Sequence, residues 1–170
     1  MDTIQDPYET QKILDSLLKS ATEEILIILP TTTTATNKRL YLYEQEYILE
    51  LLKNAAEHGA KIRILADLST KEIERKLLFI KSNSDLVKLQ FLDREQQNKV
   101  ITVIAYKELC MTAEVKDNED DNDNNDSTVE VLGLATYSNS ESTVLSYASI
   151  FETLWIQAEL KNKKRVASIS

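Results

Sequence analysis

An uninterrupted apolar run, Ile25–Leu29 (ILIIL), restricts the possible folds of this chain more than any other feature. A strand with one solvent-exposed face alternates apolar and polar residues, whereas a strand without polar residues is typical of a parallel sheet covered on both faces. The sequence also contains only two glycines and two prolines, which is unfavourable for a loop-rich or all-β fold. The run therefore predicts an α/β domain with helices on both faces of its sheet.

Helices and strands are predicted to alternate along the chain. Asp6 as N-cap, Pro7 at the first helical position and Glu9 as capping-box partner predict a first helix. A helix over 42–58 is predicted to end at Gly59, and another runs from Ser69 to Ile80. The predicted strands are 25–29, 61–66, 87–91, 100–105, 108–115 and 129–135, with 100–115 forming an antiparallel hairpin. These elements predict a mixed, mostly parallel sheet, followed by a polar turn over 136–142 and a long C-terminal helix.

The C-terminal helix carries a regular apolar stripe. Five residues recur in steps of four, three, four and three, the spacing of a coiled-coil seam: Val144, Ala148, Phe151, Trp155 and Ala158. The stripe continues toward the basic segment 161–165, and neither glycine nor proline ends the helix. We expect a domain over residues 1–142 and a dimerising, signal-transmitting helix over residues 143–170.

Four segments resemble the sensor domain of archaeal sensor histidine kinases. Gly133–Trp155 (GLATYSNSESTVLSYASIFETLW) resembles the segment that joins this sensor to its kinase core. Further matches are ETQKIL from Glu9, EILIILP from Glu24 and AAEHGAKIRIL from Ala55. The fold of this sensor is similar to one half of a phospholipase D-like protein. The resemblance implies a non-catalytic input domain that forms a homodimer and acts on a kinase core elsewhere in a longer parent chain.

Phospholipase D-like enzymes use the motif HxKxxxxD, and the sequence departs from it. Alignment on the predicted hairpin places Gln97 at the histidine position, Lys99 at the lysine and Ile104 at the aspartate. Glutamine cannot act as nucleophile or shuttle a proton near neutral pH, and isoleucine cannot orient a base. We therefore predict no catalytic residue and no enzymatic activity for this chain.

Polar residues that follow the predicted strands are candidates for a ligand site. Ligands of open α/β sheets bind beyond the carboxyl ends of the strands. The candidates for a small-molecule site at this edge are Thr32, Thr33, Thr34, Arg39, Asp67 and Lys99. The alternative is an ordinary connecting loop with surface hydroxyls, and the sequence does not identify a ligand.

Neither a metal nor a cofactor is expected. The acidic run 117–126 has acceptors at some calcium-loop positions between Glu119 and Glu130, but an asparagine replaces the required glycine. We interpret 117–128 as a disordered hairpin extension. The single histidine, His58, is expected to stabilise a helix end, and the single cysteine, Cys110, is expected to pack in a strand.

Charge and hydrophobicity limit the partners. A net charge of −8 argues against nucleic acid, because phosphates require clustered Lys and Arg. No apolar run approaches the ~20 residues that span a bilayer, and the first residues are acidic and unlike a signal peptide. A single cysteine suits a reducing compartment, so we expect a cytoplasmic domain. Two alternatives are an effector-binding domain of a transcriptional regulator, for which no helix-turn-helix is present, and a phospholipase D-like phosphodiesterase.

Overall fold

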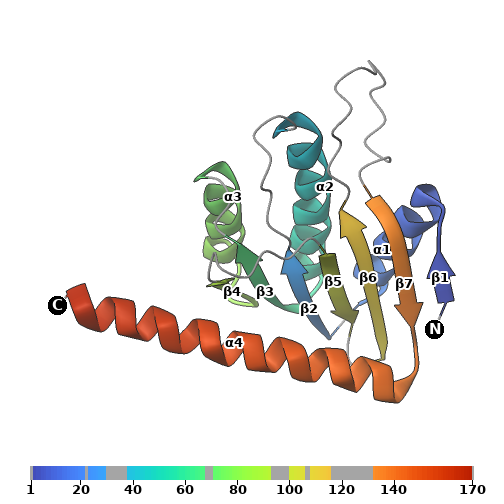
Figure 1. Cartoon of the computed structure of the whole chain (residues 1–170). Coiled ribbons are helices and arrows are strands. Elements are labelled where there is room, and N and C mark those ends of the chain that lie inside the picture. Colours follow the sequence, from blue (N-terminus) through green and yellow to red (C-terminus); the bar gives the residue numbers. More distant parts are fainter. Residues whose placement is uncertain are drawn as a thin grey trace.

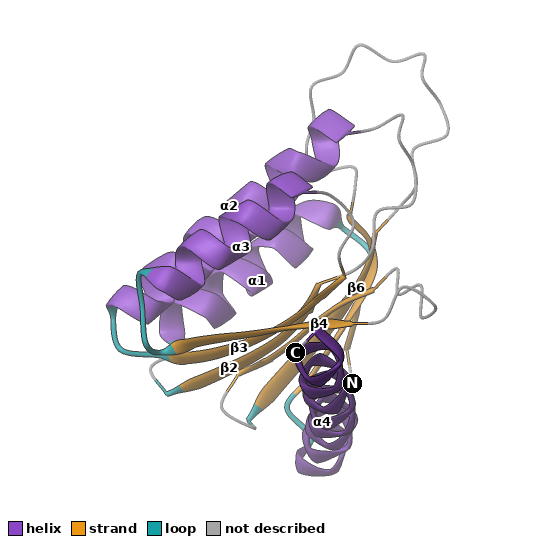
Figure 2. Cartoon of the chain, turned by 90° about the vertical axis from the view of Figure 1, so that its left-hand side faces the viewer, coloured by secondary structure: helices purple, strands orange, loops and turns teal. Residues whose placement is uncertain are grey.

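A central sheet with helices on both faces organises the chain (Figures 1 and 2). The computed structural model describes residues 2–21, 23–29, 38–67, 71–92, 100–105, 108–115 and 132–169. Within them the elements are β1 (Asp2–Ile4), α1 (Pro7–Ser20), β2 (Glu24–Leu29), α2 (Lys38–Glu57), β3 (Lys61–Asp67), α3 (Lys71–Ser82), β4 (Val87–Leu92), β5 (Val100–Ala105), β6 (Leu109–Val115), β7 (Leu132–Ser138) and α4 (Glu141–Ile169).

The described strands form one sheet in the order β1-β7-β6-β5-β2-β3-β4. Only β2–β3 and β3–β4 are parallel, and the other neighbouring pairs are antiparallel. The prediction of a mostly parallel sheet was therefore wrong. The cause is that β5, β6 and β7 form an antiparallel meander, and that β1, which the sequence analysis missed, adds an antiparallel strand at the edge.

The apolar run of β2 is explained by the layers on its two sides. Among the described residues, helices α1, α2 and α3 cover one face of the sheet and α4 crosses the other, as Figure 2 shows. Ile25, Ile27 and Leu29 belong to the hydrophobic core on the three-helix side. Leu26 and Ile28 belong to a second core, which contains α4 residues. The predicted helices on both faces are thus confirmed.

Local signals set most of the element ends. The side chain of Asp6 accepts a hydrogen bond from the Tyr8 N–H at 3.0 Å and caps α1 as predicted. Gly59 has φ +95°, a conformation that side chains disfavour, and it ends α2. The Gly59 and Ala60 N–H groups then reach back to carbonyls of the last turn, as in a Schellman motif.

The polar segment before α4 differs from its prediction. Thr136, Tyr137 and Ser138 were predicted in a turn, but they continue β7. Their backbones pair with Thr112, Met111 and Cys110 of β6, and this pairing outweighs the local turn preference of serine and threonine. The connection to α4 is consequently very short, with Ser138 accepting a hydrogen bond from the Ser140 N–H at 3.1 Å.

Helix α4 is a single helix of 29 residues. It begins close to the end of β7, crosses the sheet and continues past β4, the edge strand (Figure 1). Asn162 donates a hydrogen bond to the side chain of Gln90 on β4, so the turns after Asn162 lie beyond the sheet. Among the described residues, no helix is long and apolar enough to cross a membrane.

Candidate functional site

The position of the catalytic aspartate in the motif is occupied by a core residue. Ile104 lies on β5, is fully buried and belongs to the hydrophobic core between the sheet and α4. Its neighbours in the ladder are Leu26 on β2 and Cys110 on β6. An acid at this position would be surrounded by apolar side chains. Gln97 and Lys99, the other two motif positions, lie outside the described residues.

The predicted ligand residues belong to segments that adjoin the same end of the central strands, where β2 and β3 finish and β5 begins. β2 ends at Leu29, which pairs with Ala66, and β3 ends one residue later at Asp67. β5 begins at the same edge, because Thr102 pairs with Ile28. Asp67 is therefore at the predicted edge, and Arg39 lies in the first turn of α2. Thr32, Thr33, Thr34 and Lys99 lie outside the described residues, so their grouping around a ligand stays a prediction.

Arg63 on β3 connects the sheet to α4, a connection that sequence reasoning missed. Its guanidinium donates two hydrogen bonds to the Glu152 carboxylate of α4, at 3.0 and 2.5 Å. It also donates two to Glu24 of β2, at 3.2 and 2.9 Å. Only 20% of the Arg63 side chain is exposed, so these pairs are less screened than an ion pair on the surface. The sequence feature that could have indicated this contact is a single arginine within the apolar strand KIRIL. Its partner Glu152 could not be identified, because it is distant in the sequence.

Two aromatic rings complete this contact. The Arg63 guanidinium carbon lies 5.4 Å from the ring centre of Phe151 and 5.5 Å from that of Trp155. The rings stack on each other with centres 5.8 Å apart. The hydrogen bond with Glu152 raises the pKa of Arg63 against the opposing effect of burial, and Glu24 adds to the increase. Arg63 is therefore a fixed positive charge that binds one carboxylate on the sheet and one on the helix.

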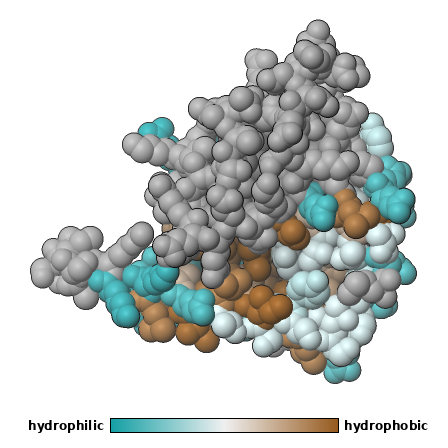
Figure 3. All heavy atoms as spheres, in the orientation of Figure 1, coloured by the Kyte–Doolittle hydropathy of each residue, from teal (hydrophilic) through white to brown (hydrophobic). Residues whose placement is uncertain are grey.

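The predicted coiled-coil seam packs against the sheet of its own chain. Val144, Ala148, Phe151 and Ala158 are buried in the core on this face of the sheet, and Trp155 packs against it. Their periodicity thus reflects contact with a sheet, which selects the same stripe of a helix as a partner helix does. The prediction that these residues face a second copy was wrong. Among the side chains of α4 that the structure describes, the large apolar ones that are exposed are instead Leu145, Ile150, Ile156 and Leu160. Figure 3 shows patches of apolar surface along the helix.

The single histidine and the single cysteine of the sequence lie at a helix end and in a strand. His58 is exposed at the end of α2, and its Nδ1 lies 2.7 Å from the carbonyl oxygen of Asn54. Cys110 is buried beside α4, and burial raises the pKa of its thiol, against the effect of a hydrogen bond to the Ser138 backbone. A raised pKa keeps the thiol protonated and unreactive at neutral pH. Cys110 therefore packs in a strand as predicted, and His58 lies at the predicted helix end, where its stabilising effect stays a prediction. The acidic segment 117–126 lies outside the described residues.

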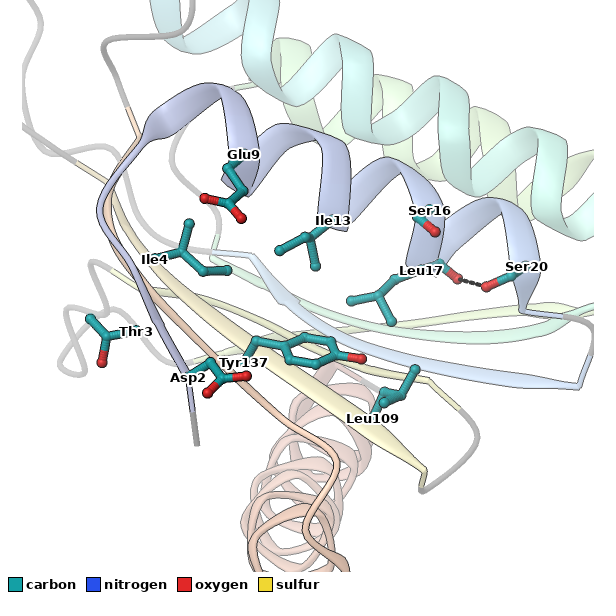
Figure 4. A pocket seen from close by; sticks show the side chains of 10 residues that line it. All are labelled: Asp2, Thr3, Ile4, Glu9, Ile13, Ser16, Leu17, Ser20, Leu109 and Tyr137. Atoms are coloured by element: carbon teal, nitrogen blue, oxygen red, sulfur yellow. Dashed lines mark hydrogen bonds between the residues drawn. The ribbon is translucent and has the colours of Figure 1, made fainter.

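A pocket on the three-helix side lies between α1 and the edge of the sheet (Figure 4). Its volume is about 640 Å³, within the range of small-molecule sites. The lining side chains come from β1, α1, β6 and β7: Asp2, Thr3, Ile4, Glu9, Ile13, Ser16, Leu17, Ser20, Leu109 and Tyr137. The Glu9 side chain lines this pocket, and it is Asp6 that caps the helix. None of these residues was predicted as a ligand residue, because β1 was not predicted.

Solved structures with the same architecture include a phospholipase D family member. Nuc from Salmonella typhimurium, a phospholipase D family member, aligns with a TM-score of 0.63 and 14% identity, over 86% of this chain and 87% of Nuc. NucT from Helicobacter pylori aligns with a TM-score of 0.62 and 15% identity, over 92% and 95%. TrmBL2, an archaeal chromatin protein with a novel mode of DNA binding, aligns with a TM-score of 0.59 and 15% identity. The match covers 92% of this chain and 52% of TrmBL2, so the chain spans about half of that protein.

These likenesses define the fold class. The chain has a phospholipase D-like α/β fold with a long C-terminal helix, as its sequence predicts. No protein-family model matches the sequence, and no curated protein matches it.

The likeness to TrmBL2 also corrects the exclusion of nucleic acid as a partner. The total charge of −8 is a poor criterion, because six acidic residues lie in 117–126 alone. Local clusters of lysine and arginine, such as 161–165, decide phosphate binding.

Proposed function

We propose that this chain is a non-catalytic input domain of a signal-transducing histidine kinase and that α4 transmits its output. The observation that carries this proposal is the attachment of α4. One continuous helix is held on the sheet by a buried apolar stripe and by Arg63, and it then passes the edge strand. A change in the sheet would therefore shift the part of α4 that continues past it. Such coupling requires a ligand with different affinities for two positions of the helix.

The absence of catalysis is the second part of this proposal. Catalysis by the motif requires both an acid–base residue and an acid that orients it. The sequence has Gln97 at the first position, and the structure buries Ile104 at the second. Lys99 is the only position of the motif that the sequence retains, and a lysine there does not replace the missing acid–base residue.

We expect the purified domain not to hydrolyse bis(4-nitrophenyl) phosphate. Its rate should equal that of Lys99→Ala, because no side chain at positions 97 and 104 can transfer a proton. The release of nitrophenolate measures the rate. Turnover by the wild type that Lys99→Ala abolishes, at matched purity, would contradict the absence of catalysis.

Pairing of two chains is the third part of the proposal, and it uses the exposed surface of α4. Leu145 and Ile156 are eleven residues apart, which is about three helical turns, so they share a face. Leu160 follows about one turn after Ile156. About half of each of these side chains is exposed (48%, 54% and 55%). Two copies of this face would bury them against each other in a symmetric contact.

We expect Ile156→Glu to convert a wild-type dimer into a monomer, because it places a charge in this apolar contact. Sedimentation velocity over a range of protein concentrations measures the change. Asn54→Glu is the matched control, since Asn54 is an exposed polar residue of α2, on the other side of the sheet from α4. A wild-type monomer at high micromolar concentration, or a dimer that is unaffected by Ile156→Glu, would exclude this contact.

An effector-binding domain of a transcriptional regulator is the second candidate function. The likeness to TrmBL2 favours it, because the chain spans about half of a protein that binds DNA. The same α4 would then act on a DNA-binding segment in place of a kinase core. The complete reading frame that encodes this chain would distinguish the two candidates. A kinase core in the same frame would support the first, and a DNA-binding segment would support the second.

A further inference from the structure

We propose that the pocket between α1 and the β1–β7 edge binds a small organic cation that has an apolar part, and that this pocket is the sensory site. The coupling of the pocket to α4 rests on the proposed function, whereas binding to the pocket does not. The pocket is about 640 Å³ in volume and opens beside the first strand of the chain. It lies away from the carboxyl ends of β2 and β3, where the sequence predicted a ligand site.

The chemistry of the lining selects a cation. The pocket has two carboxylates, Asp2 and Glu9, and no lysine, arginine or histidine among its lining residues. Figure 4 shows the acids toward one end of the pocket, with Glu9 on α1 and Asp2 on the opposite strand. An anion would therefore meet only negative charge there, whereas a protonated amine would be attracted to either carboxylate.

The rest of the lining selects an apolar part. Ile4 and Leu17 are buried, Ile13, Leu109 and Tyr137 are partly buried, and together they line the wall between the helix and the sheet. The Tyr137 ring lies across this wall in Figure 4, and an aromatic face also attracts a cation. Ser16 and Ser20 have short side chains on the α1 side, where a larger residue would fill the space.

The pocket is directly connected to α4. Asp2 pairs with Tyr137 in the β1–β7 ladder, so a ligand held by Asp2 contacts the strand that precedes α4. The next residue, Ser138, accepts the hydrogen bond from the Ser140 N–H, and α4 begins at Glu141. A shift of Tyr137 would therefore reach the first turn of α4 through three intervening residues, 138–140.

The test is a titration of the ¹⁵N-labelled domain with 2-phenylethylamine, followed by amide NMR shifts. The probes 2-phenylethanol and 3-phenylpropionate provide a neutral and an anionic group on a similar skeleton. We expect the amine to shift amides of residues 2–4, 9–20 and 137–138 and to bind about tenfold more tightly than the alcohol, with no binding of the anion. Asp2→Asn and Glu9→Gln should each weaken amine binding severalfold, and Ser16→Leu should abolish it. Glu57→Gln, an exposed acid at the end of α2, is the matched control.

Equal affinity for the amine and the alcohol, or unchanged affinity in both charge variants, would overturn the assignment of a cation site. Hydrogen exchange of the first turns of α4, with and without saturating amine, tests the coupling. We expect slower exchange in the complex. Amine binding without any change in exchange would overturn the role of this pocket in sensing, whereas the proposed function fails only if α4 does not control a kinase.

Discussion

Phe151→Ala is expected to lower the free energy of unfolding by about 3–5 kcal/mol. Phe151 is fully buried, and it is among the largest side chains in the core between the sheet and α4. Its removal leaves a cavity beneath the helix and also removes one of the two rings that contact Arg63. Urea unfolding followed by circular dichroism measures the change.

Ile150→Ala is the matched control, since the neighbouring Ile150 side chain is 54% exposed. It should change the free energy of unfolding by less than about 0.5 kcal/mol. Equal effects of the two variants would show that α4 does not pack on the sheet through Phe151. The burial also means that Phe151→Asp or Trp155→Asp would damage the folded domain itself. A loss of soluble dimer in those variants is therefore no measure of contact between two chains.

Arg63→Met is expected to lower the free energy of unfolding by about 2 kcal/mol, because Glu24 and Glu152 lose the donor they share. The expected loss of unfolding free energy is no larger because the side chains of Glu152 and Glu24 are 44% and 35% exposed. Water can therefore solvate both carboxylates when Arg63 is absent. The stacked rings also lose their cation. Urea unfolding measures the effect, and hydrogen exchange should show faster opening of α4 than of the β2–β3 ladder.

A double-mutant cycle separates the contact to the helix from the contact to the sheet. Glu152→Gln removes the charge on α4, and Glu24→Gln removes the charge on β2. We expect a coupling energy between Arg63 and Glu152 at least as large as that between Arg63 and Glu24, because Glu152 accepts the shortest of these hydrogen bonds. No coupling with Glu152 would mean that Arg63 does not hold α4 on the sheet.

Local patterns predicted most of the elements of this fold. The apolar run of β2 required cover on both faces, Asp6 marked the start of α1, and Gly59 marked the end of α2. The pairing of strands depends on contacts between distant segments, and these patterns do not specify it. β1 illustrates the limit, because a three-residue strand has no periodicity to detect. The parallel character of the sheet was overestimated for the same reason.

The candidate sites show a similar limit. The departures from the motif at Gln97 and Ile104 could be recognised in the sequence because the motif has a fixed spacing. The structure places Ile104 in the hydrophobic core. The stripe of α4 was also readable, but spacing alone does not distinguish a sheet from a second helix as its partner. Arg63 meets Glu152 only after the chain has folded, at a sequence separation of 89 residues. The pocket likewise exists only where β1 pairs with β7 beside α1.

The central claim is that α4 transmits the state of the domain, and the most direct test is a fusion of residues 1–164 to a histidine-kinase core. Alanines are inserted one at a time after Lys164 over a full helical turn, and autophosphorylation is measured at each length. The account predicts activity that rises and falls with the helical period of about 3.6 residues. It also predicts that Arg63→Met removes this variation at a temperature where the variant stays folded. Equal activity at every length, with and without Arg63→Met, would contradict the account.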